Sequence, residues 1–135
     1  MENKDVRWKQ RFSNYEKALT HLDDALHIKN PDIIQKAGII QFFEMSYELA
    51  WNTVKDFLED QGFVDVNSPR NALKKAFETD LIADGHTWLE LLLDRNLTAH
   101  AYDEAKATAV EKLIRNKYFS IMKDLHNTLK QKEIG

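Results

Sequence analysis

The chain has 135 residues, no cysteine, and 22 acidic against 19 basic residues, which gives a formal net charge of −3. This length fits one domain, spanning residues 1–135, around one hydrophobic core. The lack of cysteine excludes disulfides, thiolate zinc sites, iron–sulfur clusters and a cysteine nucleophile. The charge balance lacks the overall basic footprint of a nucleic-acid-binding protein, so contact with RNA or DNA must come from a local patch.

The chain contains four glycines and two prolines. Such scarcity of turn residues argues against an all-β fold with many turns and favours long helices. Residues 1–5 are too polar for a signal peptide, and no apolar run approaches the roughly 20 residues of a membrane span. We therefore expect a soluble, cytoplasmic protein that does not bind a membrane.

Two long helices are predicted in the N-terminal half. The first has apolar residues at steps of three and four, which is the period of one helix face: Trp8, Phe12, Tyr15, Leu19, Leu22 and Leu26. Asn30-Pro31-Asp32 ends it and starts a second helix of roughly 30 residues, which leaves through Gly62. On this second helix, Phe42 and Phe43 either belong to a dimer interface or widen the core stripe.

Three further helices are predicted after residue 67. Ser68-Pro69 is a strong start signal for a short helix that runs to about Leu81. Asp84-Gly85 separates it from a fourth helix, and Asp103 is the expected N-cap of a fifth. Residues 130–135 are expected to fray. The predicted fold class is therefore all-α, an antiparallel bundle of the up-and-down four-helix-bundle type with about five helices.

The sequence offers no ligand set for a metal and no fingerprint for a nucleotide cofactor. None of the five histidines forms a His-x-x-x-His pair or follows a glutamate by three positions, as the ligands of a di-iron bundle do. The few glycines do not form a P-loop or a dinucleotide-binding loop. We therefore predict no metal and no cofactor.

Glu44 and Glu48 lie four residues apart and share a helix face near Tyr47 and Trp51. A glutamate among such apolar neighbours acts as a general base, holds an arginine from elsewhere in the chain, or lies on the surface between two apolar stripes. The sequence leaves these alternatives open and favours a structural role.

The segment from Asp94 to Asp103 combines residue types that suit phosphate chemistry. Asn96 and His100 lie four residues apart, where an apolar stripe should have continued, and Arg95 is adjacent. Histidine exchanges a proton near neutral pH, and arginine suits a phosphate. Tyr102 precedes the predicted N-cap, so we expect it to be accessible. The spacing alone also fits a structural pair at an interface.

Three ordered motifs resemble those of a known family. Residues 43–51, FEMSYELAW, resemble the "FE-x-x-[FY]-ELAW" signature of small bacterial helical proteins called nucleotidyltransferase substrate-binding proteins. Ser68-Pro69-Arg70 fits the same family. Residues 94–102, DRNLTAHAY, are similar to the Arg-x4-His-x-Tyr motif of HepT toxins in the HEPN superfamily. The resemblance covers nearly the whole chain and implies a HEPN-like bundle.

This resemblance implies two alternative functions. In the first, the protein is the toxin of a toxin–antitoxin pair, a metal-independent ribonuclease that an MNT-type nucleotidyltransferase neutralises by transferring AMP to Tyr102. Arg95 and His100 would then be catalytic, supported by Asn96, and RNA would be the substrate. In the second, the protein is a non-catalytic substrate-binding subunit of a two-component nucleotidyltransferase.

The spacing of the motif raises a geometric problem. Arg95 and His100 are five residues apart, which is about 140° around a regular α-helix. Either the helix ends or distorts before His100, or a second subunit completes the site. The resemblance implies the second solution, because HEPN ribonucleases are typically homodimers with paired motifs in a shared cleft. Two copies of Arg95 and His100 would then form a local positive patch.

Overall fold

The computed structural model describes residues 2–135, with side chains from residue 6 onward. The prediction that residues 1–5 are too polar for a signal peptide includes Met1, which lies outside the described residues. Within residues 2–135, all regular structure is helical: α1 (Glu2–Leu26), α2 (Ile33–Asp60), α3 (Pro69–Glu78), α4 (Gly85–Asp94), the 3-10 helix η1 (Arg95–His100), α5 (Glu104–Leu113), the π-helical segment η2 (Ile114–Tyr118) and α6 (Phe119–Ile134).

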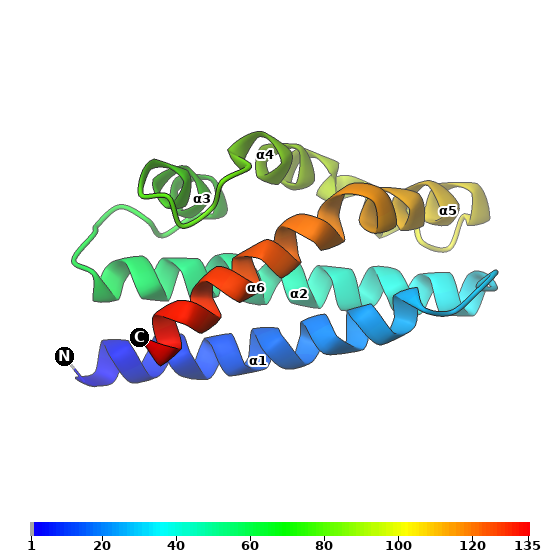
Figure 1. The fold of residues 1–135 in the computed structure, drawn as a ribbon. Helices are drawn as coiled ribbons and strands as arrows, with labels where there is room; N and C mark the ends of the chain where they lie inside the picture. Colours follow the sequence, from blue (N-terminus) through cyan, green and yellow to red (C-terminus); the bar gives the residue numbers. More distant parts are fainter. Residues whose placement is uncertain (1) are drawn as a thin grey trace.

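The helices form an antiparallel bundle (Figure 1). α1 and α2 run in opposite directions and pack against each other along most of their length. α5, η2 and α6 follow one another without a break, so they act as one long helix that crosses back over α1 and α2 to the C-terminus. α3 and α4 lie above α2 on the side away from α1. The predicted all-α fold with about five helices is confirmed.

Capping side chains fix where most of these helices begin. Asp32 accepts a hydrogen bond from the backbone N–H of Gln35, whose side chain accepts one in return from the N–H of Asp32. Ser68 and Asp103 cap α3 and α5 by accepting from the N–H three residues later, as the sequence predicted. Each cap satisfies a backbone donor that lacks an intrahelical partner. Gly62, with φ = +96°, takes the left-handed conformation predicted for the end of the second helix.

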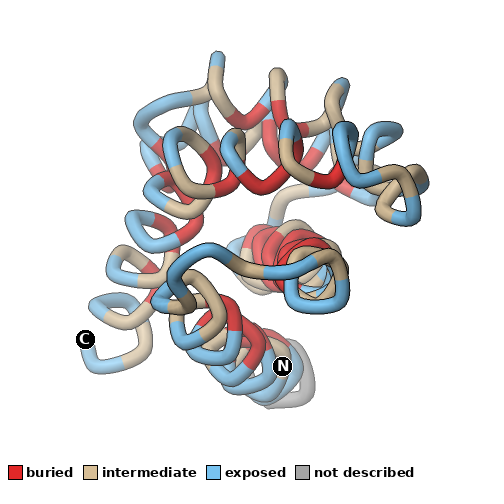
Figure 2. The backbone as a smooth tube through the Cα atoms, turned by 90° about the vertical axis from the view of Figure 1, so that its right-hand side faces the viewer, coloured by how far each residue is buried: buried red, intermediate tan, exposed pale blue. Residues whose placement is uncertain are grey.

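One hydrophobic core lies where the helices face one another, as the buried positions in Figure 2 show. The six residues of the predicted α1 stripe belong to it, of which Leu26 is partly buried at the end of the helix. Phe43 is buried and stacks on Tyr118, with ring centroids 5.9 Å apart. Phe42 is partly buried, and its ring lies 5.3 Å from the ring of His21. Phe43 therefore widens the core stripe and is not a surface residue.

Two predicted boundaries are wrong. The third helix ends at Glu78 instead of about Leu81, because Asp80 turns left-handed at φ = +62° and sends Leu81 into the core. The C-terminal residues do not fray, since α6 continues to Ile134. Lys130 pairs there with Glu16 of α1 at 3.5 Å, which ties the last turns to the bundle.

None of the helices in residues 2–135 combines the length and the apolar character that crossing a membrane requires.

The packing of the last turns can be tested with Leu129→Ala. Leu129 is fully buried, so the substitution is expected to lower the free energy of unfolding by about 2–5 kcal/mol. Ile134→Ala is the control, because Ile134 is 71% exposed and should change stability by less than about 0.5 kcal/mol. Urea unfolding measures both. Equal, small effects would mean that the end of α6 does not pack.

Candidate functional site

The helix that carries Arg95 changes its geometry at that residue. α4 ends at Asp94, and the chain continues as the 3-10 helix η1. Aspartate, asparagine and threonine offer the backbone alternative hydrogen bonds and disfavour a continued α-helix. The Thr98 hydroxyl indeed donates to the carbonyl oxygen of Arg95 at 2.7 Å. The predicted alternative in which the helix ends or distorts before His100 is therefore realised.

Arg95 is held by three side chains of α2. Its Nη2 donates to Glu48 Oε1 at 3.1 Å, and its Nε lies 3.5 Å from Glu44 Oε1. The guanidinium carbon lies 4.6 Å from the centre of the Tyr47 ring, which is within the range of a cation–π contact. Trp51 Nε1 donates to the other oxygen of Glu48 at 3.1 Å and orients that carboxylate. Of the three alternatives for Glu44 and Glu48, the structure thus supports the one in which they hold an arginine.

This arrangement gives the Arg95 surroundings an excess of negative charge, with two carboxylates around one guanidinium. Partial burial acts to lower the pKa of Arg95, but Glu44, Tyr47 and Glu48 outweigh it and raise that pKa above its ordinary value. Arg95 is therefore a fixed cation. Within a single protomer Arg95 forms no positive patch, and the patch that the sequence led us to expect involves two copies of Arg95 and His100. The Nη1 group takes part in neither carboxylate contact and is the part of the guanidinium left for a ligand.

Asp94, the residue before Arg95, is fixed from the opposite side by a residue that the sequence did not assign to the site. The Tyr118 hydroxyl donates a hydrogen bond to Asp94 Oδ2, and Lys117 donates to Glu90 Oε2 at 2.9 Å. Both donors lie in η2, where the backbone N–H of Phe119 bonds five residues back. Burial, followed by the hydrogen bond to Asp94, raises the pKa of Tyr118. The π segment thus anchors the end of α4 to the C-terminal helix.

The remaining motif residues lie on the accessible segment after α4. Tyr102 is 80% exposed, as predicted, and its hydroxyl lies 3.4 Å from Nδ1 of the half-buried His100. The two rings meet edge to face with centroids 5.9 Å apart. Asn96 is exposed, and its side chain makes no hydrogen bond within the described range. The structure therefore pairs His100 with Tyr102 and leaves Asn96 open to solvent.

Arg95 and His100 do not face the same direction within one chain. Five residues of a 3-10 helix rotate by about 240°, which leaves the two side chains about 120° apart, and advance about 10 Å along the axis. The change from α to 3-10 geometry therefore does not bring them onto one face. Their hydrogen bonds and ion pairs also go to different partners, on α2 for Arg95 and to Tyr102 for His100.

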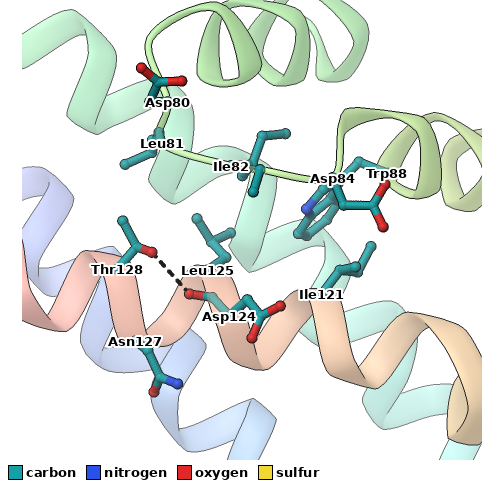
Figure 3. A pocket seen from close by; sticks show the side chains of 11 residues that line it. Asp80, Leu81, Ile82, Asp84, Trp88, Ile121, Asp124, Leu125, Asn127 and Thr128 are labelled. Atoms are coloured by element: carbon teal, nitrogen blue, oxygen red, sulfur yellow. Dashed lines mark hydrogen bonds between the residues drawn. The ribbon is translucent and has the colours of Figure 1, made fainter.

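The structure also has a hollow of about 360 Å³ between the α3–α4 connection and α6 (Figure 3). Its charged lining residues are Asp80, Asp84 and Asp124, and Leu81 and Leu125 contribute apolar surface. Three carboxylates repel a phosphate, so this hollow does not suit the chemistry of the motif. Among the side chains that the structure describes, those of residues 6–135, no group of three or more histidines, aspartates or glutamates is arranged to hold a metal ion.

The burial of Tyr47 predicts that the protein loses stability at alkaline pH. Burial, together with Glu48 and Glu44, raises the pKa of Tyr47 to about 12, although Arg95 opposes the shift. An unfolded tyrosine titrates near pH 10. The contribution of Tyr47 to stability is therefore expected to be constant below about pH 10 and to fall as the pH rises towards 12, because the unfolded state loses the proton first.

Tyr47→Phe should remove part of this alkaline loss. The Tyr47 hydroxyl has no hydrogen-bond partner by geometry, so the variant should match the wild type at pH 7 within about 1 kcal/mol. Tyr102→Phe, which removes an exposed hydroxyl, should keep the wild-type profile. Urea unfolding between pH 7 and 11.5 measures all three proteins. Identical profiles for the wild type and Tyr47→Phe would contradict the raised pKa.

Comparison with known proteins identifies the family. Residues 10–131 match the family model described as "Nucleotidyltransferase substrate binding protein like". A Haemophilus influenzae protein named probable ribonuclease HepT is 34% identical over 87 residues, which are 59% of this chain and 60% of that relative. The alignment therefore spans about three fifths of the relative's length.

Two solved structures share the fold. A crystal structure of a Thermus thermophilus protein has a TM-score of 0.76 and 28% identity, and covers 85% of this chain and 98% of its own. A Haemophilus influenzae structure, described as revealing the fold of a substrate binding domain of a nucleotidyltransferase, has a TM-score of 0.67 and 28% identity. The match covers 94% of this chain and 98% of that one. With most of its length matched by the family model, the chain belongs to the nucleotidyltransferase substrate-binding protein-like family as a HepT-like member.

Proposed function

We propose that the protein is a metal-independent ribonuclease, the HEPN toxin of a HEPN/MNT pair, acting in the cytoplasm. The observation that carries the proposal is the placement of His100 beside the exposed Tyr102. His100 lies five residues after Arg95, which the side chains of α2 hold in a fixed position. The name of the Haemophilus influenzae relative, probable ribonuclease HepT, supports the same activity. Arg95, Asn96 and His100 are the proposed catalytic residues.

The proposed cleavage uses the RNA's own nucleophile. The ribose 2′-hydroxyl attacks the neighbouring phosphorus, the bond from phosphorus to the 5′-oxygen breaks, and that oxygen takes up a proton. His100 moves a proton in this reaction, a contribution of about 10²–10⁴-fold to the rate. Arg95 Nη1 stabilises the negative charge that builds on the phosphate oxygens, and Asn96 offers a further hydrogen-bond donor. None of these roles requires a metal ion.

We propose that two chains build each site. In an ideal 3-10 helix, Arg95 and His100 of one chain are about 120° apart, and in the structure they have different partners, which disfavours contact of both with one phosphate in the same protomer. In a two-fold symmetric dimer, each cleft would be lined by Arg95 of one subunit and His100 of the other.

Tyr102 is the proposed acceptor of AMP from a partner nucleotidyltransferase. Its oxygen would attack the α-phosphorus of ATP and lose its proton, and pyrophosphate would leave. The exposure of Tyr102 makes this reaction sterically accessible. The product is a bulky anion next to the ring that now lies 3.4 Å from the Tyr102 oxygen. It would exclude RNA from His100 and compete for Arg95, which accounts for neutralisation.

A second candidate function is a non-catalytic subunit that presents a small molecule or nucleotide to a nucleotidyltransferase. The description of the family and of the Haemophilus influenzae structure favour it. In this case Glu44, Glu48 and Trp51 hold Arg95 as part of a binding surface, and His100 has no role in a reaction.

Loss of catalysis is the first test. His100→Ala is expected to lower the rate of RNA cleavage by about 10²–10⁴-fold in a buffer that contains EDTA, without a change in thermal stability. His27→Ala is the matched control, because His27 is an exposed histidine that follows α1 and lies outside the proposed site. Toxicity on expression without the partner should follow the same pattern. If the wild type and His100→Ala are equally harmless and leave RNA intact, the ribonuclease proposal is wrong.

Intact-mass spectrometry after incubation with the partner and ATP separates the two functions. The toxin proposal predicts one or more AMP additions to the wild type, none at this site in Tyr102→Phe, and loss of RNA cleavage in the modified protein. Transfer of AMP to a free small molecule, with the protein mass unchanged, would support the substrate-binding subunit instead.

A further inference from the structure

A second surface with the chemistry of nucleic-acid binding lies between α3 and α4. It is a groove of about 460 Å³. Cationic and apolar side chains both line it, and the lining residues used below are Arg70, Lys74, Phe77, Gly85 and Leu89. None of them belongs to the Arg95–His100 site.

The α3 side of this groove carries unpaired positive charge. Arg70, Lys74 and Phe77 are spaced four and three residues apart, so they share one face of the helix. Neither Arg70 nor Lys74 makes a hydrogen bond or ion pair with any described residue. Lys75, on a neighbouring face, is by contrast paired with Glu78 at 3.0 Å. Arg70 and Lys74 therefore differ from Arg95, whose charge is already offset by two carboxylates.

The groove also presents an aromatic ring to solvent. Phe77 is 52% exposed and lies against the start of α4. A Cβ atom at Gly85 would be 2.8 Å from Cδ1 of Phe77, closer than atoms in contact allow, so the ring can lie there because residue 85 has no side chain. The ring therefore lies against the protein backbone at Gly85 and remains about half exposed to solvent.

α4 connects this groove with the proposed catalytic segment. Leu89 lines the groove, and Leu93 and Leu97 follow at intervals of four residues, all three exposed. From Leu89, the helix advances about 9 Å to Arg95, and η1 adds about 10 Å to His100. Measured along the helix axis, the groove and the proposed site are thus about 9–19 Å apart, a separation that one strand of a few nucleotides can span.

We propose that this groove is a second RNA subsite, which stacks a nucleobase of single-stranded RNA on Phe77 and holds flanking phosphates with Arg70 and Lys74. This rests on the proposed function. Aromatic platforms beside positively charged side chains are the usual means of binding single strands without sequence preference. A polyanion fits the groove better than a protein surface does, because burying two unpaired cations against protein requires matching carboxylates.

The test measures the binding of a fluorescently labelled single-stranded RNA oligonucleotide by anisotropy, in a His100→Ala background that does not cleave it. Arg70→Gln/Lys74→Gln should reduce the slope of log K against log salt by about 1.4, since each phosphate contact on a single strand contributes about 0.7. Phe77→Leu keeps the apolar volume but removes the ring, and should weaken binding roughly fivefold or more. The charge-matched control, Lys17→Gln/Lys132→Gln on α1 and α6, should leave the slope unchanged.

Two results would overturn the subsite. The first is that the groove variants bind RNA with the same affinity and the same slope of log K against log salt as the parent His100→Ala protein, or that this parent protein does not bind RNA at all. The other is a change in subunit number of the groove variants by light scattering, which would make the groove a contact between copies of the chain. Cleavage by the protein with native His100 is scored separately. Weakened binding in the groove variants without any cleavage by the wild type would support the subsite and refute the ribonuclease.

Discussion

The ion pairs of Arg95 with Glu44 and Glu48 are the interaction on which the rest of the site depends. They join the middle of α2 to the end of α4, two segments about 50 residues apart in the sequence. With the Tyr47 ring on one side and the Tyr118–Asp94 hydrogen bond at the preceding residue, they fix both the position of the guanidinium and the point where α4 becomes η1. The exposed segment that carries His100 and Tyr102 starts from this fixed point.

This interaction has an electrostatic consequence. A guanidinium between two carboxylates is permanently charged and positioned, but its field is largely cancelled at a distance. Arg95 can therefore stabilise a phosphate only in direct contact, through Nη1, and does not attract RNA to the protein. Under the proposed function, long-range attraction of RNA must come from other cations, such as Arg70 and Lys74 of α3. The proposed RNA contacts of this acidic chain are then local, while the rest of its surface repels RNA.

The features that the sequence predicted well are those with local causes. Ser68 and Asp103 cap their helices because each accepts a hydrogen bond from a backbone N–H three residues away, and the local sequence is enough to predict this. The sequence left the pairing of Glu44 with Arg95 as one of three alternative roles for Glu44 and Glu48. The residues around a charged side chain do not determine which opposite charge on another helix it contacts. The 3-10 and π segments, and with them the role of Tyr118, depend on how α4 packs against the C-terminal helix. The end of α6 was missed for the same reason, since its order comes from Leu129 and Lys130 contacting the bundle.

The central claim is that Arg95 of one subunit and His100 of the other act on the same phosphate. Mixing Arg95→Gln with His100→Ala, after unfolding and refolding together, tests it most directly. Each variant alone is expected to be inactive. In the mixture, half of the dimers contain one of each, and every such dimer has one intact cleft, so about a quarter of the wild-type RNA cleavage should return. A mixture that stays inactive while the refolded wild type cleaves RNA would contradict the shared site.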